Sequence, residues 1–125
     1  MAKEWCVKGL KLKFTINGLD VTNTGTATII SQPSTKTKIN GNGVYFDTFN
    51  CIFAGCVYNG YTQVSPASYS ISCGAQYSKE NNSPIMLVED NQTASGISFV
   101  MGQTSTTFDI KCEVADPGQN FVKEK

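Results

Sequence analysis

Residues 35–47 read TKTKINGNGVYFD and residues 76–88 read QYSKENNSPIMLV, so a related segment occurs twice at a spacing of 41 residues. Aligned at that spacing, Lys38 matches Lys79 and the apolar run after the first turn matches the apolar run after the second. Each copy is a short extended run, a turn rich in Asn and Gly, and an apolar run, which is the pattern of a tight β-hairpin. The repetition predicts a pseudo-repetitive β domain.

Alternation of apolar and polar residues predicts further strands. It is cleanest in residues 6–16 and 106–114, whose expected inward-facing side chains are Leu10, Leu12, Phe14 and Ile16 in the first and Phe108, Ile110, Cys112 and Val114 in the second. Shorter strands are expected at residues 26–30, 50–54, 69–73 and 96–101, with a loop-rich middle over 55–68. No segment has a sustained helical period, so the chain is expected to be one all-β domain over residues 1–125, with a frayed tail at 119–125.

Composition excludes several function classes. The ten basic residues are all Lys and are balanced by ten acidic residues, which leaves no net field for binding nucleic acid. No apolar run approaches the ~20 residues that cross a bilayer, so an integral membrane protein is not expected. Residues 1–5 carry both charges and no apolar stretch, which is not a secretory signal. The chain is therefore expected to be made in the cytoplasm and to leave, if it does, by another route.

The chain has no His, which removes Ser-His and Cys-His nucleophile pairs. Glu89 and Asp90 are adjacent, and neighbouring residues of a strand point to opposite faces, so they make a poor acid/base pair. They are interpreted as solvated turn residues. The sequence therefore predicts a protein that is not an enzyme.

Five cysteines form an odd set, and a full disulfide framework is not expected for a chain that folds in a reducing compartment. Four of them (Cys51, Cys56, Cys73 and Cys112) are candidate ligands, because four thiolates brought to one point suit tetrahedral Zn²⁺ or Fe. The alternative is that these thiols are small buried hydrophobes. Cys6 is expected to belong to the core.

The aromatic residues allow a second interpretation of function. Six of them could form a stacking surface for sugars or bases, namely Trp5, Tyr45, Tyr58, Tyr61, Tyr69 and Tyr77. Packing between strands explains the same residues without a ligand. The alternative function is therefore a β-sandwich binding module that recognises glycan or protein through exposed aromatic side chains.

The two repeated segments, together with the closing run DPGQN at residues 116–120, resemble PAAR-like proteins over residues 30–120. These are the spike-tip proteins of contractile injection machines such as type VI secretion systems and phage tails. The family's recurring pattern T-K-V-x-I-x-G-K-P-V-L is similar to the run from Thr35 to Val44. The resemblance implies a compact conical domain of short antiparallel strands. Many members bind a metal near the apex through His and Cys, so a site in this chain would have to be all-thiolate.

The resemblance also implies a role. A PAAR-like chain is a structural tip that sits as a monomer on a trimeric β-helical spike, sharpens it for envelope penetration, and can carry effector cargo. A spike end leaves strand edges unpaired, and a rigid β domain with a suitable base would cover them. The expected location after synthesis is the tip of an injection apparatus.

Overall fold

The computed structural model describes residues 3–80 and 82–123, and the only helix among them is one turn of 3-10 helix. In chain order the elements are β1 (Lys11–Ile16), β2 (Leu19–Asp20), η1 (Thr22–Thr24), β3 (Thr26–Ile29), β4 (Lys38–Ile39), β5 (Asn42–Gly43), β6 (Thr48–Ala54), β7 (Val57–Tyr58), β8 (Tyr61–Gln63), β9 (Ala67–Ser72), β10 (Lys79–Glu80), β11 (Ser83–Pro84), β12 (Asn91–Met101) and β13 (Thr104–Asp116). The all-β prediction is confirmed. The described residues include no helix with the length and hydropathy of a membrane span.

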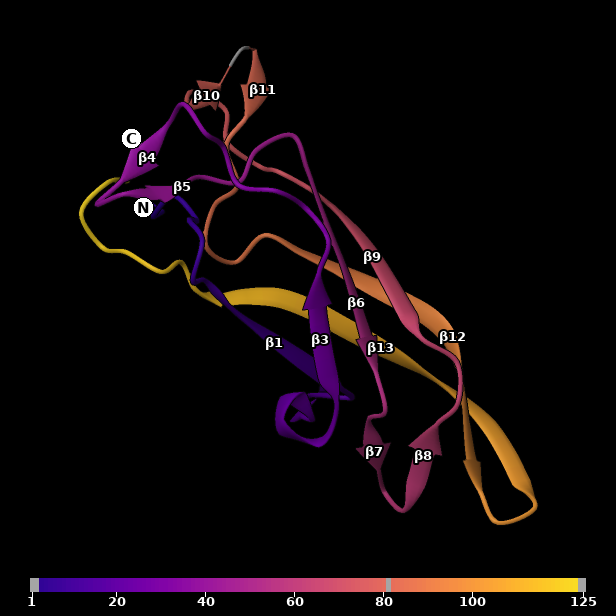
Figure 1. The fold of residues 1–125 in the computed structure, drawn as a ribbon. Helices are drawn as coiled ribbons and strands as arrows, with labels where there is room; N and C mark the ends of the chain where they lie inside the picture. The colour runs from indigo at the N-terminus through magenta and orange to yellow at the C-terminus, as the bar shows by residue number, and fades with distance from the viewer. Residues whose placement is uncertain (1–2, 81, 124–125) are drawn as a thin grey trace.

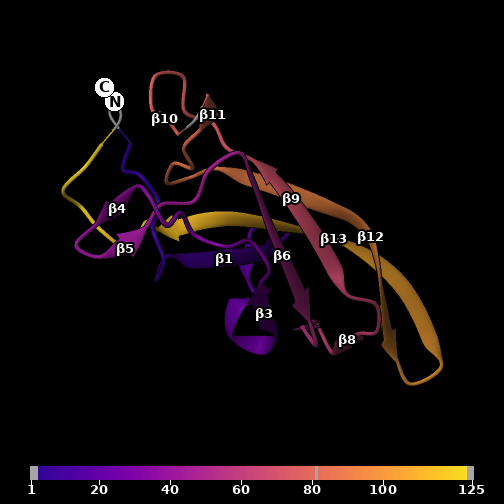
Figure 2. The same ribbon diagram turned by 45° about the horizontal axis from the view of Figure 1, so that its top comes forward.

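The larger sheet has six strands in the order β2-β1-β13-β12-β8-β7 and curls into half a barrel (Figures 1 and 2). Hydrogen bonds connect the edge strand β7 to the turn between β1 and β2 and to η1. Asn17 donates to the Tyr58 hydroxyl at 3.3 Å, and the backbone N–H of Val57 donates to Thr24 Oγ1 at 3.1 Å. These contacts hold the curl without a continuous backbone ladder around the barrel.

The smaller sheet, β3-β6-β9, supplies the other side of the main core. Phe14 of β1 stacks on Phe53 of β6 with ring centroids 3.9 Å apart and an interplanar angle of 7°. The Tyr69 hydroxyl of β9 donates to the Ile110 carbonyl of β13 at 2.9 Å, which joins the two sheets through a buried bond. Each large apolar side chain buried here contributes about 1.5–3 kcal/mol.

The predicted strand faces are confirmed in β1 and β13. Phe14, Ile16, Ile110, Cys112 and Val114 are buried, and the polar residues between them are not. The middle of the chain is more regular than expected, because β7 and β8 form a hairpin within residues 55–68. Its turn is Asn59-Gly60, with φ of 53° and 85°, the left-handed pair that a two-residue hairpin turn requires.

The repeated segments adopt the same conformation in their described residues. Strands β4 and β5 pair Lys38 with Gly43, and β10 and β11 pair Lys79 with Pro84, which is the same register 41 residues later. The N–H of Val44 donates to the Thr37 carbonyl at 3.0 Å, and the equivalent bond from Ile85 to Ser78 is 2.9 Å. The prediction that the hairpin occurs twice is confirmed, although Asn81 lies outside the described residues.

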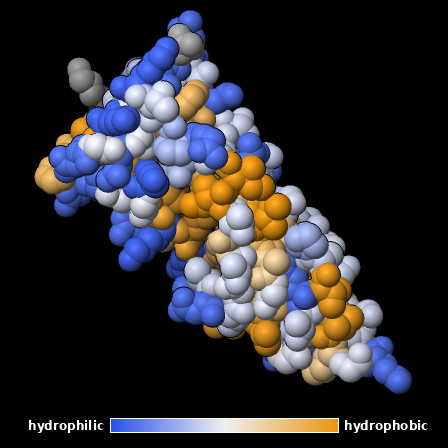
Figure 3. Space-filling model, viewed as in Figure 1, coloured by the Kyte–Doolittle hydropathy of each residue, from blue (hydrophilic) through white to orange (hydrophobic). Residues whose placement is uncertain are grey.

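The molecule is elongated and tapers (Figures 1 and 3). Its broad end carries the hairpins β4–β5 and β10–β11 together with both ends of the chain. The two sheets β2-β1-β13-β12-β8-β7 and β3-β6-β9 form the rest of the molecule, which we call the body. Strands β12 and β13 run the length of the body, and the turn between them, Gly102-Gln103, forms the narrow end.

Candidate functional site

Three short extended segments close a ring at the broad end. The backbone N–H of Cys6 donates to Met86 at 2.8 Å, that of Met86 donates to Tyr45 at 2.9 Å, and that of Tyr45 donates to Cys6 at 3.0 Å. The residues on either side form three bridges in the same cyclic order, namely Val7 with Val44, Phe46 with Ile85, and Leu87 with Trp5. Residues 5–7, 44–46 and 85–87 are therefore related by a pseudo-threefold axis, and we call them the ring.

A second set of backbone bonds repeats the same rotation. It runs from Lys8 N–H to Gly43 at 2.9 Å, from Asp47 to Pro84 at 2.7 Å, and from Val88 to Glu4 at 3.0 Å. Fifteen residues (4–8, 43–47 and 84–88) thus obey one threefold pattern in a chain whose visible repeat is only twofold. We call residues 33–47 unit 1 and residues 74–88 unit 2. Unit 3 consists of residues 118–123 together with residues 4–8. The three units form the broad end of the molecule, which we call the threefold end.

Unit 3 is assembled from the two ends of the chain. Lys123 bridges to Glu4 where unit 1 pairs Lys38 with Gly43, so the third hairpin is present but its two strands come from opposite termini. The Gln119 side chain donates to Trp5 and Val122 carbonyls, both at 2.8 Å, and accepts the N–H groups of Phe121 and Val122. Residues 119–123 are held in this unit, where the sequence predicted a frayed tail; residues 124 and 125 lie outside the described residues.

Unit 1 holds its own loop in the way that Gln119 holds unit 3. The Ser34 hydroxyl accepts the N–H groups of Lys36 and Thr37, each at 3.0 Å, and it donates to Glu80 of unit 2. This hydrogen bond from Ser34, together with one from Thr37, holds the pKa of the Glu80 carboxyl below its usual value. The bond therefore links neighbouring units through an ionised acid.

The ring separates two cores because its side chains alternate. The central residues Cys6, Tyr45 and Met86 belong to the main core of the body. The flanking residues form a second, smaller core on the other side: Val7, Val44, Ile85 and Leu87 are buried there with Ile39 and Ala75, and Trp5, Phe46 and Val122 pack against them. The threefold end is thus a packed structural unit and is not a set of loops.

Shallow grooves lie between neighbouring units at the threefold end. One is lined by Trp5, Tyr77, Ser78 and Lys123, where the indole N–H of Trp5 donates to Ser78 Oγ at 3.0 Å. Another is lined in part by Lys36, Phe46, Lys79 and Glu80. Lys36 in one groove and Tyr77 in the other occupy equivalent positions of units 1 and 2. Lys79 and Lys123, which line the same two grooves, occupy equivalent positions of units 2 and 3. The two grooves are therefore related by the same pseudo-symmetry.

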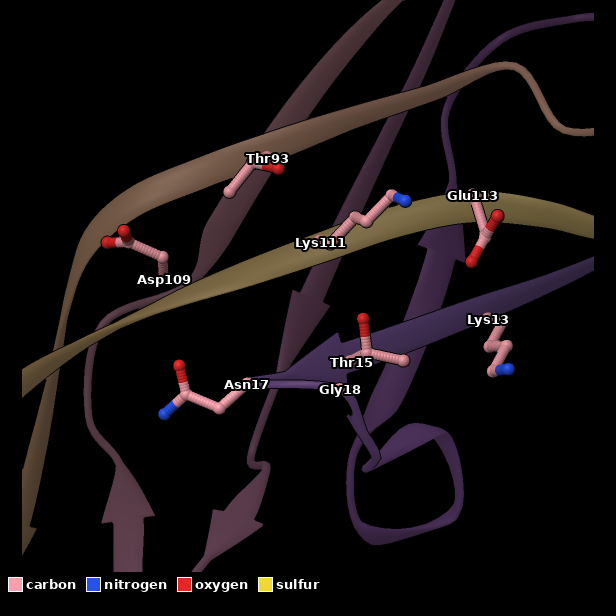
Figure 4. A pocket seen from close by; sticks show the side chains of 8 residues that line it. All are labelled: Lys13, Thr15, Asn17, Gly18, Thr93, Asp109, Lys111 and Glu113. Carbon is pink, nitrogen blue, oxygen red and sulfur yellow. The ribbon is translucent and has the colours of Figure 1, made fainter.

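The outer face of the body is polar and has a shallow depression. Figure 4 shows side chains from β1, β12 and β13 around a depression, among them Lys13, Asp109, Lys111 and Glu113. Lys13 lies opposite Glu113 in the ladder between β1 and β13, as charged cross-strand neighbours commonly do. This arrangement is that of a solvated sheet face, and it brings no nucleophile and base together.

The four candidate metal ligands are not brought together. Cys51 of β6 and Cys112 of β13 are hydrogen-bonded to each other in the main core, but Cys56 lies beside Thr24 Oγ1 at 3.5 Å and Cys73 lies nearer to Cys6 and Asp90. Among the described residues, no group of three or more Cys, Asp or Glu side chains could hold a metal ion. All five thiols are buried and free, so the alternative of small core residues describes them better.

Burial changes the titration of these thiols. It raises the pKa of Cys73 from 9.0 to about 12, with a further contribution from the charges of Asp90 and Asp47. Burial also raises the pKa of Cys6. The pKa of Cys112 is raised mainly by its hydrogen bond with Cys51 and, to a lesser extent, by burial. Cys51 is the exception, because its hydrogen bond with Cys112 lowers its pKa. Reactive thiolates have lowered pKa values, so Cys6 and Cys73 are unsuited to nucleophilic chemistry.

These shifts predict a loss of stability in alkali. Below pH 9 the thiols of Cys6 and Cys73 are protonated in both states; above pH 9 they ionise in the unfolded chain but stay protonated in the fold. The unfolded state then binds fewer protons, so the free energy of unfolding should fall as pH rises, by about 1.4 kcal/mol per pH unit for each such thiol. Urea unfolding with reductant between pH 8 and 10 measures this. The Cys73→Ala variant should show a shallower slope, and a flat wild-type profile would contradict the assignment.

Most of the six aromatic residues of the alternative function are buried or partly buried. Tyr45 and Tyr69 are buried, Tyr58 and Tyr61 pack edge-on against Phe108, and Trp5 is partly buried. Of the six aromatic residues considered, Tyr77 alone is largely exposed, at 73%.

Asp90 is also structural. Its carboxylate accepts the N–H groups of Gly74 and Leu87, both at 2.9 Å, and so anchors the turn after unit 2. The sequence predicted a solvated turn residue, and the structure adds this anchoring role. Glu89 forms an ion pair with Lys3 at 3.4 Å between exposed side chains.

Sequence reasoning found units 1 and 2 and missed unit 3. The sequence of unit 3 does resemble that of unit 2. Gly118 and Lys123 are equivalent to Gly74 and Lys79, and residues 5–7 form an apolar run like residues 85–87. It was hidden because these pieces lie at opposite ends of the chain.

Comparison with known proteins found no matching family model, no similar curated protein and no similar solved structure.

Proposed function

We propose that this chain is a structural tip protein that sits on the end of a threefold-symmetric spike, as the PAAR-like proteins that it resembles do. The observation that carries the proposal is the closed ring of three segments around a pseudo-threefold axis. A single chain can match a trimer only if it presents three similar surfaces at 120°, and the three units supply them. The spike would be the kind of trimeric β-helix that leaves strand edges open at its end.

The docking face in this proposal is the threefold end. Tyr77 and Phe121 occupy equivalent positions of units 2 and 3 and are 73% and 71% exposed. Exposed aromatic side chains at related positions are unusual for a surface without a partner, and aromatic residues often dominate binding energy. The molecule tapers away from this end (Figure 3), and the turn between β12 and β13 lies at the narrow end (Figure 1). In this orientation that turn would point toward the target.

The mechanism is mechanical. Among the described residues no group of three or more Cys, Asp or Glu side chains could hold a metal ion, and the two cores pack on opposite sides of the ring. A tip of this kind would concentrate the force of sheath contraction on a small apex. It would also cover the open backbone groups of the spike end.

The proposal predicts a complex with the trimeric spike protein encoded near this gene, detected by co-purification and size-exclusion chromatography. The double variant Tyr77→Ser and Phe121→Ser should bind at least about tenfold more weakly, because two aromatic contacts are lost. Met101→Ser, which changes an exposed apolar side chain at the narrow end, is the matched control and should bind like the wild type. Loss of binding in the control alone, or no complex with wild-type protein, would contradict the proposal.

A further inference from the structure

One exposed side chain is the same in all three units. The lysines at equivalent positions are Lys38, Lys79 and Lys123, which pair across their hairpins with Gly43, Pro84 and Glu4. All three are exposed, whereas the equivalent exposed positions two residues earlier hold Lys36, Tyr77 and Phe121, which differ in chemistry. Selection for a common contact would leave this pattern, since packing inside the units does not require a lysine on the outer side of each hairpin.

Two of these lysines, Lys79 and Lys123, lie where neighbouring units meet. Lys79 of unit 2 borders the groove whose other wall is Lys36 and Phe46 of unit 1. Lys123 of unit 3 borders the groove that also holds Tyr77 of unit 2. Lys38 occupies the equivalent position in the hairpin of unit 1, so the three lysines follow the pseudo-threefold pattern of the ring.

Nothing in the described part of the chain neutralises them by direct contact. The ion pair within 4.0 Å among residues 3–80 and 82–123 is that of Lys3 with Glu89. Glu80, the acidic neighbour of Lys79 in sequence, is turned to Ser34 instead. Three positive charges are thus available to a partner at one end of a protein whose net charge is zero.

A homotrimer presents every side chain three times, related by rotation. We propose that Lys38, Lys79 and Lys123 each bind one carboxylate, and that each of these carboxylates comes from a different subunit of a homotrimeric spike, so that charge pairing fixes the rotation of the tip on the trimer. This inference rests on the proposed function and deepens it. Complementary charges of this kind set register and association rate more than they set total affinity.

The test uses the full chain and the trimeric spike protein encoded near its gene, with binding measured by biolayer interferometry at low and high salt. Each variant Lys38→Gln, Lys79→Gln and Lys123→Gln should weaken binding by a similar factor of about two to five, as exposed ion pairs do. The triple variant should lose about ten- to a hundredfold and most of its salt dependence. The matched control, Lys11→Gln with Lys13→Gln and Lys111→Gln, removes the same charge from the body and should change affinity less than twofold.

The outcomes separate the two proposals. Tight binding by the triple variant would overturn the lysine contact and leave the tip function standing. A loss confined to one lysine would also overturn it, because a trimer must use all three. Absence of a complex with the wild type would overturn both. Binding of the wild type to phosphatidylserine vesicles and not to the trimer would assign the lysines to an anionic membrane and overturn the proposal.

Discussion

Deletion of residues 119–125 is expected to lower the free energy of unfolding by about 3–5 kcal/mol, as measured by urea denaturation. The deletion removes the Gln119 side chain, which donates hydrogen bonds to the Trp5 and Val122 carbonyls. It also removes the Val122 carbonyl, which accepts the backbone N–H of Trp5 at 3.1 Å. It also uncovers the small core on the side where Val122 packs. Each hydrogen bond contributes about 1 kcal/mol, and the buried groups left without partners cost more.

The deletion separates two descriptions of the terminus. A frayed tail could be removed without effect, whereas unit 3 cannot form without residues 119–123. The point variant Gln119→Ala should lose about 1–3 kcal/mol, because its amide serves four backbone groups. Asn120→Ala, at an exposed neighbouring position, should stay within about 0.5 kcal/mol of the wild type. A deletion that unfolds at the wild-type urea midpoint would show that the ring does not depend on the C-terminal segment.

Replacement of Gly43 by Ala is expected to cost about 2–3 kcal/mol. A Cβ at Gly43 would lie 2.1 Å from the Ser34 carbonyl oxygen and 3.0 Å from Pro33 Cβ, so the backbone of unit 1 would have to move. That movement would also disturb the bond from the Lys8 N–H to the Gly43 carbonyl, which joins unit 3 to unit 1. Thermal and urea unfolding of the variant measure the loss.

The matched control for Gly43→Ala is Asn42→Ala, the other residue of β5, whose side chain is exposed. It should change stability by less than about 0.5 kcal/mol. If both variants were equally stable, the close packing of β5 on residues 33–34 would be wrong, and with it the joint between units 1 and 3.

The parts of the fold that could be predicted were those with local signals. Alternation placed Phe14 and Ile110 on inward faces, and the run rich in Asn and Gly located the tight turn at Asn40-Gly41, where both residues have positive φ. These signals work because strand faces and two-residue turns are fixed by neighbours in the chain.

The parts that could not be predicted depend on which distant strands meet. The position of a thiol on a strand does not say which other strand faces it, so the sequence could not show that Cys51 meets Cys112 while Cys56 and Cys73 lie elsewhere. The same holds for Gln63, a buried amide that bonds the Phe53 and Ser65 carbonyls and the Cys56 N–H and so fixes the β7–β8 hairpin. Its neighbours in sequence give no sign of that role.

Native mass spectrometry of the complex between this chain and the trimeric spike tests the central claim most directly. Three units in one chain should occupy all three equivalent surfaces of the trimer at once, so we expect one copy of this chain for each three spike subunits. A complex with three copies per trimer would mean that each copy contacts one subunit, and the threefold end would then not be the docking face.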